Sequence, residues 1–196
     1  MKYVKILGLL AVAAAALMAF AASASATTVT TDTTKTTDAK IIHAVSVGHV
    51  TLHSPLGDIS CASTAEGEIT SQGSGVTASG PLTEKEKGLT FSGCTEGWHV
   101  TVLNSGTLEA HWTSGYNGTL TSKNAQVDAT VGGITCVYET KATGTPVGTV
   151  TGGNPAVLDI SASIPINTAL SSPFCGTNPS GWTGTYQSTG ALYLWE

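Results

Sequence analysis

Three residues in the middle of the chain have side chains of the types that bind divalent metals. His99 and His111 flank a turn signal, and Glu109 lies two residues before His111. If the flanking segments pair as a hairpin, both imidazoles and the carboxylate gather on one face and could hold a metal ion. A solvated polar face with two histidines opposite each other by chance explains the same pattern. We favour that interpretation, because a metal site also needs supporting groups around its ligands.

The hairpin that would position these residues has a definite predicted register. Asn104-Ser105-Gly106 is a good three-residue loop, in which the glycine can adopt the left-handed conformation of a bulge. The loop pairs Leu103 with Thr107 and places the two histidines opposite each other. One face is then wholly polar and the other wholly apolar, so we expect the apolar face to point to the core. That face consists of Trp98, Val100, Val102, Leu108, Ala110 and Trp112.

Three aromatic residues form a second candidate site, one for ligand binding. Trp182 and Tyr186 share a face of an alternating segment, and Tyr116 lies in the loop-like Ser114–Gly118. An exposed row of aromatic rings can stack on the apolar faces of sugar rings. The alternative is that these rings fill the core, where large aromatic side chains usually lie.

No residue is assigned a catalytic role. The chain contains neither the G-x-S-x-G pattern nor the H-E-x-x-H pattern. Nothing marks any pair among its acidic residues as the carboxylate pair of a glycosidase. A Ser-His-Asp triad has no fixed spacing and stays open as an alternative. The sequence thus favours a protein that is not an enzyme, and it predicts no cofactor.

The four cysteines predict two disulfide bonds. Their number is even and none forms a C-x-x-C pair, so a zinc site is a poorer explanation. Three pairings are possible, and we favour Cys61–Cys94 with Cys136–Cys175 because these spacings divide the domain into two similar halves. Each bond would stabilise the fold by roughly 3–4 kcal/mol in the chain-entropy model.

The remaining pattern is typical of an all-β protein. From Ile41 onward, short apolar–polar alternations recur between turn signals, and one continuous strand is expected over Ile41–His53. We predict an antiparallel β-sandwich or barrel of roughly ten short strands. Residues 41–196 would form this single domain. Residues 27–40, rich in threonine and poor in apolar side chains, would be a flexible linker.

The first 26 residues read as a signal peptide. Lys2 and Lys5 precede the apolar run Ile6–Phe20, and Ala24-Ser25-Ala26 matches the pattern that signal peptidase cleaves. The run is short for a membrane span, which needs about 20 residues. We therefore expect a secreted, extracellular or surface-associated protein with no membrane span after cleavage.

The charge excludes one class of partner. The chain has 8 Lys and Arg against 13 Asp and Glu, a net charge of −5, and it contains no arginine. Loss of Lys2 and Lys5 with the signal peptide leaves the chain more acidic. Such a protein lacks the basic surface that nucleic-acid binding requires.

The layout also resembles a group of known proteins. Cys61, Phe91-Ser92-Gly93-Cys94, Cys136-Val137-Tyr138, Cys175 and the closing Trp182-Thr183-Gly184-Thr185-Tyr186 follow the order seen in small secreted β-rich actinobacterial proteins with four cysteines and no assigned activity. The resemblance covers about residues 45–196. It implies a disulfide-bonded secreted β-domain and transfers no functional residue.

Together these patterns predict a secreted or surface-associated β-domain that binds a polysaccharide or another envelope component. Two alternatives stay open. One is a secreted hydrolase whose site forms only in space, and the other is a structural protein that associates with itself.

Overall fold

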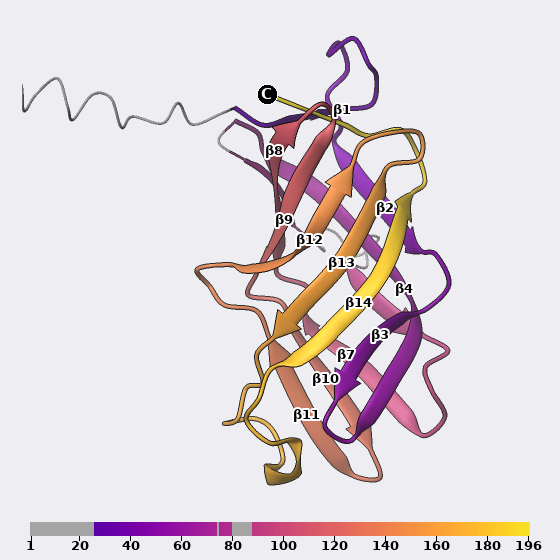
Figure 1. The fold of residues 1–196 in the computed structure, drawn as a ribbon, viewed down its shortest axis with the longest axis vertical. Helices are drawn as coiled ribbons and strands as arrows, with labels where there is room; N and C mark the ends of the chain where they lie inside the picture. Colours follow the sequence, from indigo (N-terminus) through magenta and orange to yellow (C-terminus); the bar gives the residue numbers. More distant parts are fainter. Residues whose placement is uncertain (1–25, 74, 80–87) are drawn as a thin grey trace, which may run out of the picture.

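The structure is a computed structural model, and it describes residues 26–73, 75–79 and 88–196. The predicted signal peptide, residues 1–26, lies outside this range except for Ala26. The described residues form an elongated all-β molecule (Figure 1), in which every strand pairing is antiparallel. This confirms the predicted fold class. No helix in the described part of the chain is long and apolar enough to cross a membrane.

Eight strands close into a barrel. Around the barrel the order is β13 (Val157–Ile164), β12 (Thr145–Thr151), β9 (Asn117–Lys123), β8 (Thr107–Ser114), β5 (Val76–Ser79), β4 (Gly57–Ser71), β2 (Ile41–Ser46) and β14 (Ser180–Ser188). The ring closes because β14 pairs with β13 along eight residue pairs. A closed barrel leaves these strands without a free edge on which another chain could pair.

Strand β4 is the longest strand and organises its neighbours. From its N-terminal end, one edge pairs first with β3 (Val50–Ser54) and then with β2, and the other edge first with β6 (Leu89–Ser92) and then with β5. The single strand predicted over Ile41–His53 is therefore wrong. The chain turns between β2 and β3, where Gly48 adopts a φ of +76° that favours glycine.

A three-stranded sheet lies against the lower end of the barrel in Figure 1. It consists of β7 (Trp98–Asn104), β10 (Gln126–Val131) and β11 (Ile134–Glu139), with β10 in the middle. The predicted hairpin between β7 and β8 is wrong, because β7 pairs with β10 instead. Both edges of β8 are occupied by β5 and β9, so β8 has no edge left for β7.

The predicted facing of these two strands is nevertheless largely correct. The side chains that pack against the core are Trp98, Val100, Leu108, Ala110 and Trp112, whereas Val102 is not among them. Alternation fixes which side chains share a face, and this holds whichever strand becomes the partner. Five of the six side chains that the hairpin would have buried therefore pack against the core, two from the three-stranded sheet and three from the barrel.

The segment predicted as a flexible linker is part of the fold, which corrects that expectation. Within residues 27–40, β1 (Thr28–Thr30) pairs with the C-terminal strand β15 (Tyr193–Trp195) and covers the upper end of the barrel in Figure 1. Thr27 is 1% exposed and Val29 is 2% exposed. In the loop that follows, the Asp32 carboxylate accepts hydrogen bonds from Thr34 and Thr36, which hold its pKa well below its usual range.

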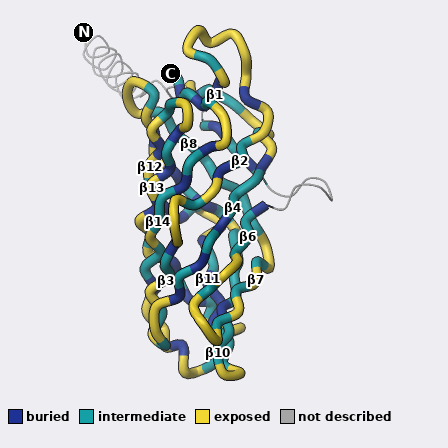
Figure 2. The backbone as a smooth tube through the Cα atoms, turned by 90° about the vertical axis from the view of Figure 1, so that its right-hand side faces the viewer, coloured by how far each residue is buried: buried dark blue, intermediate teal, exposed yellow. Residues whose placement is uncertain are grey.

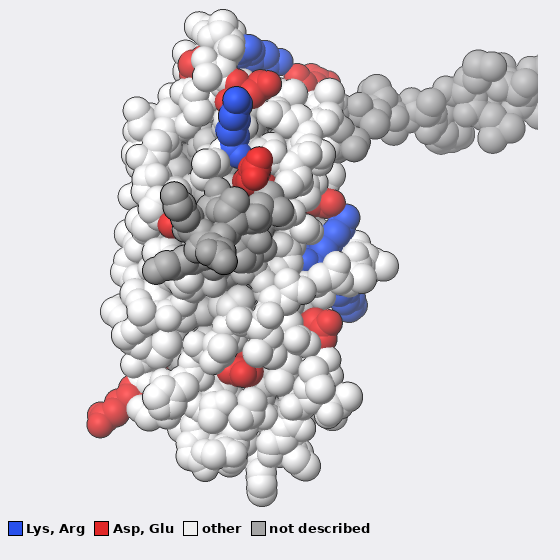
Figure 3. Space-filling model, turned by 180° about the vertical axis from the view of Figure 1, so that it is seen from behind, with Lys and Arg blue, Asp and Glu red and all other residues white. Residues whose placement is uncertain are grey.

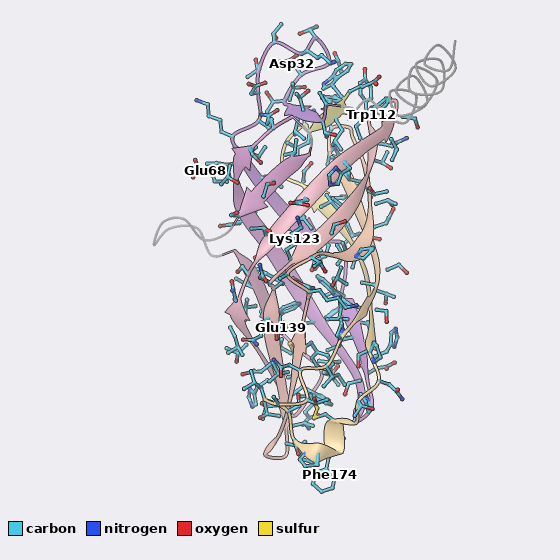
Figure 4. The ribbon with its side chains drawn as sticks, turned by 90° about the vertical axis from the view of Figure 1, so that its left-hand side faces the viewer. Asp32, Glu68, Trp112, Lys123, Glu139 and Phe174 are labelled. Carbon is cyan, nitrogen blue, oxygen red and sulfur yellow. A yellow bond between two sulfur atoms is a disulfide. The ribbon has the colours of Figure 1, made fainter. Side chains whose placement is uncertain are left out.

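The two disulfides join Cys61 to Cys94 and Cys136 to Cys175, which confirms the predicted pairing. The first ties β4 to the segment after β6. The second ties β11 to η1 (Pro173–Cys175), a single helical turn at the lower tip. Phe174 in this turn is exposed and points away from the fold (Figure 4).

Buried side chains follow the inner face of each strand from one end of the molecule to the other (Figure 2). On β4 the inner face is carried by odd-numbered residues, among them Ile59, Cys61 and Ser63. On β14 it is carried by even-numbered residues, ending in Tyr186 and Ser188. The core is thus one continuous column inside the barrel.

Candidate functional site

The column of buried side chains lines a cavity of about 170 Å³ that is partly open to the outside. Its wall is almost entirely apolar and comes from both the barrel and the three-stranded sheet. Aliphatic wall residues include Ile42, Val50, Leu52, Ile59, Leu89, Val100, Leu108, Val127, Leu158, Ile160 and Ile164. Such an interior differs from a fully packed core, where spaces larger than a water molecule are few.

Two of the predicted ligand-binding aromatic residues lie in this wall. Trp182 and Tyr186 share one face of β14, as predicted, and that face is the inner one. Gly184 between them leaves room for Val50, whose side chain would lie 2.5 Å from a Cβ at that position. An exposed aromatic row for stacking on sugars is therefore not formed by these two residues.

Tyr186 is buried with its hydroxyl group satisfied. The hydroxyl donates a hydrogen bond to Ser63 Oγ at 2.9 Å, and Ser63 donates to the carbonyl oxygen of Thr90 at 2.8 Å. Burial, only partly offset by this hydrogen bond, raises the pKa of Tyr186 to about 12. The side chain is thus a neutral part of the cavity wall.

Tyr138 is the second tyrosine in the wall. It lies on β11, where Cys136 and Tyr138 are buried and Ile134 packs against the core, as the alternation predicts. Tyr138 is 3% exposed, and its hydroxyl makes no hydrogen bond to any described residue. The two tyrosines therefore differ in their hydroxyl groups, because that of Tyr186 has a hydrogen-bond partner and that of Tyr138 has none among the described residues.

The cavity has a more polar rim on one side. Gly88 and the polar residues Glu66, Ser79, Ser105 and Thr107 lie where β5 ends, β6 begins and β7 connects to β8. Two hydrogen bonds hold this region together, from Leu89 N to Ser105 Oγ and from Glu66 N to Gly88 O. The rim lies beside one edge of β4, at the point where the strand paired with β4 changes from β6 to β5.

The third predicted aromatic residue, Tyr116, lies elsewhere. Its ring packs edge-on against Tyr193 at 5.1 Å and against Trp195 at 4.8 Å between ring centroids. Lys35 Nζ lies 5.0 Å from the Trp195 ring centroid. Tyr116 is half-buried, not fully exposed as its loop position suggested, and it belongs to the aromatic cluster that fastens β15.

Only two of the three predicted metal ligands lie close together, because His111 Nε2 lies 3.8 Å from a carboxylate oxygen of Glu109 and His99 is on a different sheet. His99 lies on β7 opposite Thr130, whereas His111 lies on β8 opposite Thr119. The Glu109 carboxylate pairs with Lys123 Nζ at 2.7 Å, midway along the barrel (Figure 4). The described residues contain no group of three or more histidine, cysteine or acidic side chains that could hold a metal. The metal hypothesis fails because the hairpin on which it depended does not form.

One surface cluster has the composition of a catalytic triad. His53 Nδ1 lies 3.0 Å from Asp58 Oδ1, and His53 Nε2 lies 3.5 Å from Thr183 Oγ1. All three side chains are exposed on the outer face of the sheet, and none of them lines the cavity. A nucleophile also needs a cavity that holds the substrate beside it, and this cluster lies on the exposed face away from the cavity.

The comparisons with known proteins add no constraint on this site. No protein-family model, no curated protein and no solved structure matches the chain.

Proposed function

We propose that this protein is an exported, non-enzymatic binding protein that holds one small apolar molecule inside its barrel. The observation that carries the proposal is the apolar cavity of about 170 Å³ between the interior of the eight-stranded barrel and the three-stranded sheet. Barrels of about eight strands have interiors just wide enough to be filled by side chains or to hold one small ligand. The wall is lined mainly by apolar and aromatic residues with few polar groups, as is typical of small-molecule sites.

The volume limits the size of the ligand. An engineered apolar cavity of about 150 Å³ stays dry and binds benzene. A cavity of about 170 Å³ therefore fits one ring with a small substituent. A fatty acid or a sugar chain is too large for it.

The electrostatics of the wall favour a neutral ligand. Among the wall residues that the structure describes, Glu66 is the only ionisable side chain besides the two tyrosines, and its carboxylate lies 3.2 Å from His43 Nε2 on the neighbouring strand. A charged ligand would lose its hydration without gaining a partner, which is costly in an apolar site. The proposed ligand is therefore uncharged and mostly apolar.

The expected polysaccharide ligand has less support. It required exposed aromatic rings, whereas Trp182 and Tyr186 face the interior and Tyr116 packs in the aromatic cluster at the barrel end. The same residues, Trp182 and Tyr186, become contacts for a small molecule within the barrel. The proposed function is therefore still binding, but the proposed ligand is a small apolar molecule and not a polysaccharide.

The place of action follows from the disulfides and the signal sequence. Two disulfide bonds are typical of proteins that fold in an oxidising compartment. Residues 1–26 have the pattern of a cleaved export signal. We therefore place the binding activity outside the cytoplasm.

A titration of the oxidised protein with toluene, followed by calorimetry, tests the proposal. The unmodified chain should bind toluene, and Ala65→Leu should weaken binding by at least about tenfold, because Ala65 lies in the cavity wall. Ala62→Leu is the matched control, since Ala62 lies on the same strand with the opposite parity and is not in the wall. Absence of toluene binding to the unmodified chain, or equal binding by both variants, would overturn the proposal.

A further inference from the structure

The three-stranded sheet is joined to the rest of the molecule differently along its two edges. At the β11 edge, Glu139 N donates a hydrogen bond to the carbonyl oxygen of Pro165 at 3.0 Å. Asn167 N donates to the carbonyl oxygen of Val137 at 2.8 Å on the same edge. At the β7 edge the neighbouring strand is β6, and no backbone hydrogen bond joins β6 to β7 in the described part of the chain. We call this unpaired boundary the β6–β7 seam.

The seam borders the cavity. Leu89 and Phe91 of β6 and Val100 of β7 belong to the cavity wall, and all three residues are partly exposed. Ser105 and Thr107, two residues of the polar rim, follow directly after β7. Polar groups in an otherwise apolar wall cost least where they keep contact with water. The rim therefore indicates that the cavity meets solvent at the end of the seam where Ser105 lies.

The two ends of the seam are held with different strength. In the turn between β6 and β7, Cys94 is in a disulfide with β4. In the same turn, Thr95 N donates to the carbonyl oxygen of Ser60 and Thr95 Oγ1 accepts from Ser60 N, each at 2.9 Å. At the other end, Leu89 N donates to Ser105 Oγ at 3.2 Å. Among the described residues, this is the only hydrogen bond across the seam.

We infer that the β6–β7 seam is the route by which the ligand enters and leaves the cavity. This inference rests on the proposed function and adds the access route to it. Separating two strands that share a ladder breaks several backbone hydrogen bonds, whereas opening the seam breaks the one bond between Leu89 and Ser105. Segments with few hydrogen bonds open before the rest of a fold. β7 turns away from β6 about the Cys94 end, and the gap forms at Ser105.

Ser105→Ala tests the route because it removes the hydrogen bond across the seam. The rates at which toluene binds and dissociates should be measured by NMR exchange spectroscopy. We expect Ser105→Ala to raise both rates by about three- to tenfold, the contribution of one hydrogen bond, and to leave the dissociation constant nearly unchanged. Ser171→Ala is the matched control, because Ser171 Oγ accepts a hydrogen bond from Val137 N at 2.8 Å on the closed β11 edge. Both rates should be unchanged in this control.

The outcomes separate this inference from the proposed function. If toluene binds and its rates are the same in Ser105→Ala and in the unmodified chain, the inference is overturned while the apolar site stands. The same holds if only the dissociation rate rises, because Ser105 then acts on the bound state and not on the route. If toluene does not bind the unmodified chain, both are overturned.

A second readout needs no ligand. Hydrogen exchange of the unmodified chain compares the amide of Leu89, which is bound across the seam, with the amide of Val137, which is bound to Ser171 on the closed edge. The protection factor of Leu89 should be at least about tenfold lower, since the seam opens without the rest of the sheet. Equal protection of the two amides would contradict a seam that opens by itself.

Discussion

At the scale of single residues, the two buried tyrosines differ in how the fold satisfies their hydroxyl groups. Tyr186 completes a chain of hydrogen bonds through Ser63 to the Thr90 carbonyl and so joins β14, β4 and β6. Tyr138 has the same ring in the same cavity wall, but no partner for its hydroxyl. The first hydroxyl links three strands of the barrel, whereas the second is buried without a partner among the described residues.

Tyr186 should make the stability of the protein fall at alkaline pH. Its pKa is raised from 10.0 to about 12 in the folded state, so the unfolded chain loses this proton first as the pH rises. The free energy of unfolding should therefore be unaffected below pH 10 and fall by about 2 kcal/mol by about pH 11.5. Urea unfolding of the unmodified chain and of Tyr186→Phe across this range measures the effect.

The variant provides the control for other groups that titrate in the same range. Tyr186→Phe should be less stable than the unmodified chain at neutral pH, by roughly 1 kcal/mol for the lost hydrogen bond, and should have a shallower decline above pH 10. Identical alkaline slopes for the two proteins would show that Tyr186 ionises as readily in the folded state as in the unfolded one.

At the scale of elements, the two ends of the chain cooperate to close one end of the barrel. Val29 on β1 lies opposite Leu194 on β15, and both face a small hollow of about 30 Å³ inside the upper barrel. Leu194 packs on Gly118 of β9, where a Cβ would lie 2.6 Å from its side chain. The cap therefore depends on apolar contacts of a segment whose composition is otherwise that of a polar linker.

Shortening Val29 should weaken this cap. Val29→Ala removes a side chain that is 2% exposed, so the free energy of unfolding should fall by about 2 kcal/mol. The amides of β1 and β15 should also exchange with deuterium faster. Thr28→Ala is the control on the same strand, because Thr28 is only half-buried. Unchanged exchange in Val29→Ala would contradict a cap that is held by this contact.

The elements also show what the sequence can and cannot predict. Alternation correctly predicts that Trp182 and Tyr186 share a face of the strand. It does not say whether that face points into the barrel or to solvent, because alternation only divides the residues between two faces. The disulfide pairing could be predicted because spacing alone favoured it. The partner of β7 could not, because a good local turn at Asn104–Gly106 competes with pairing to β10, which is distant in sequence.

The linker prediction was wrong for a related reason. The low apolar content of residues 27–40 is typical of disorder, yet Val29 and Ala39 are enough to anchor the segment once the barrel provides a surface. The cavity itself has no sequence signature. It arises where the barrel and the three-stranded sheet meet, and it needs a strand order that no local pattern encodes.

At the scale of the whole molecule, the charge and the shape agree with a binding protein that does not act through its surface charge. Charged residues make up 11% of the chain, and on the back face of the molecule they are few and scattered among uncharged residues (Figure 3). A closed barrel, two disulfides and a cap give a rigid container. Rigid containers bind small ligands with little loss of conformational entropy.

The most direct test of the central claim is a nuclear Overhauser measurement on the protein saturated with toluene. The account predicts contacts from the toluene protons to side chains of the cavity wall, among them Trp182, Leu158 and Tyr186. These contacts should be lost in Ala65→Leu. Contacts only to the exposed Leu170 and Phe174, or no contacts at all, would contradict a ligand site inside the barrel.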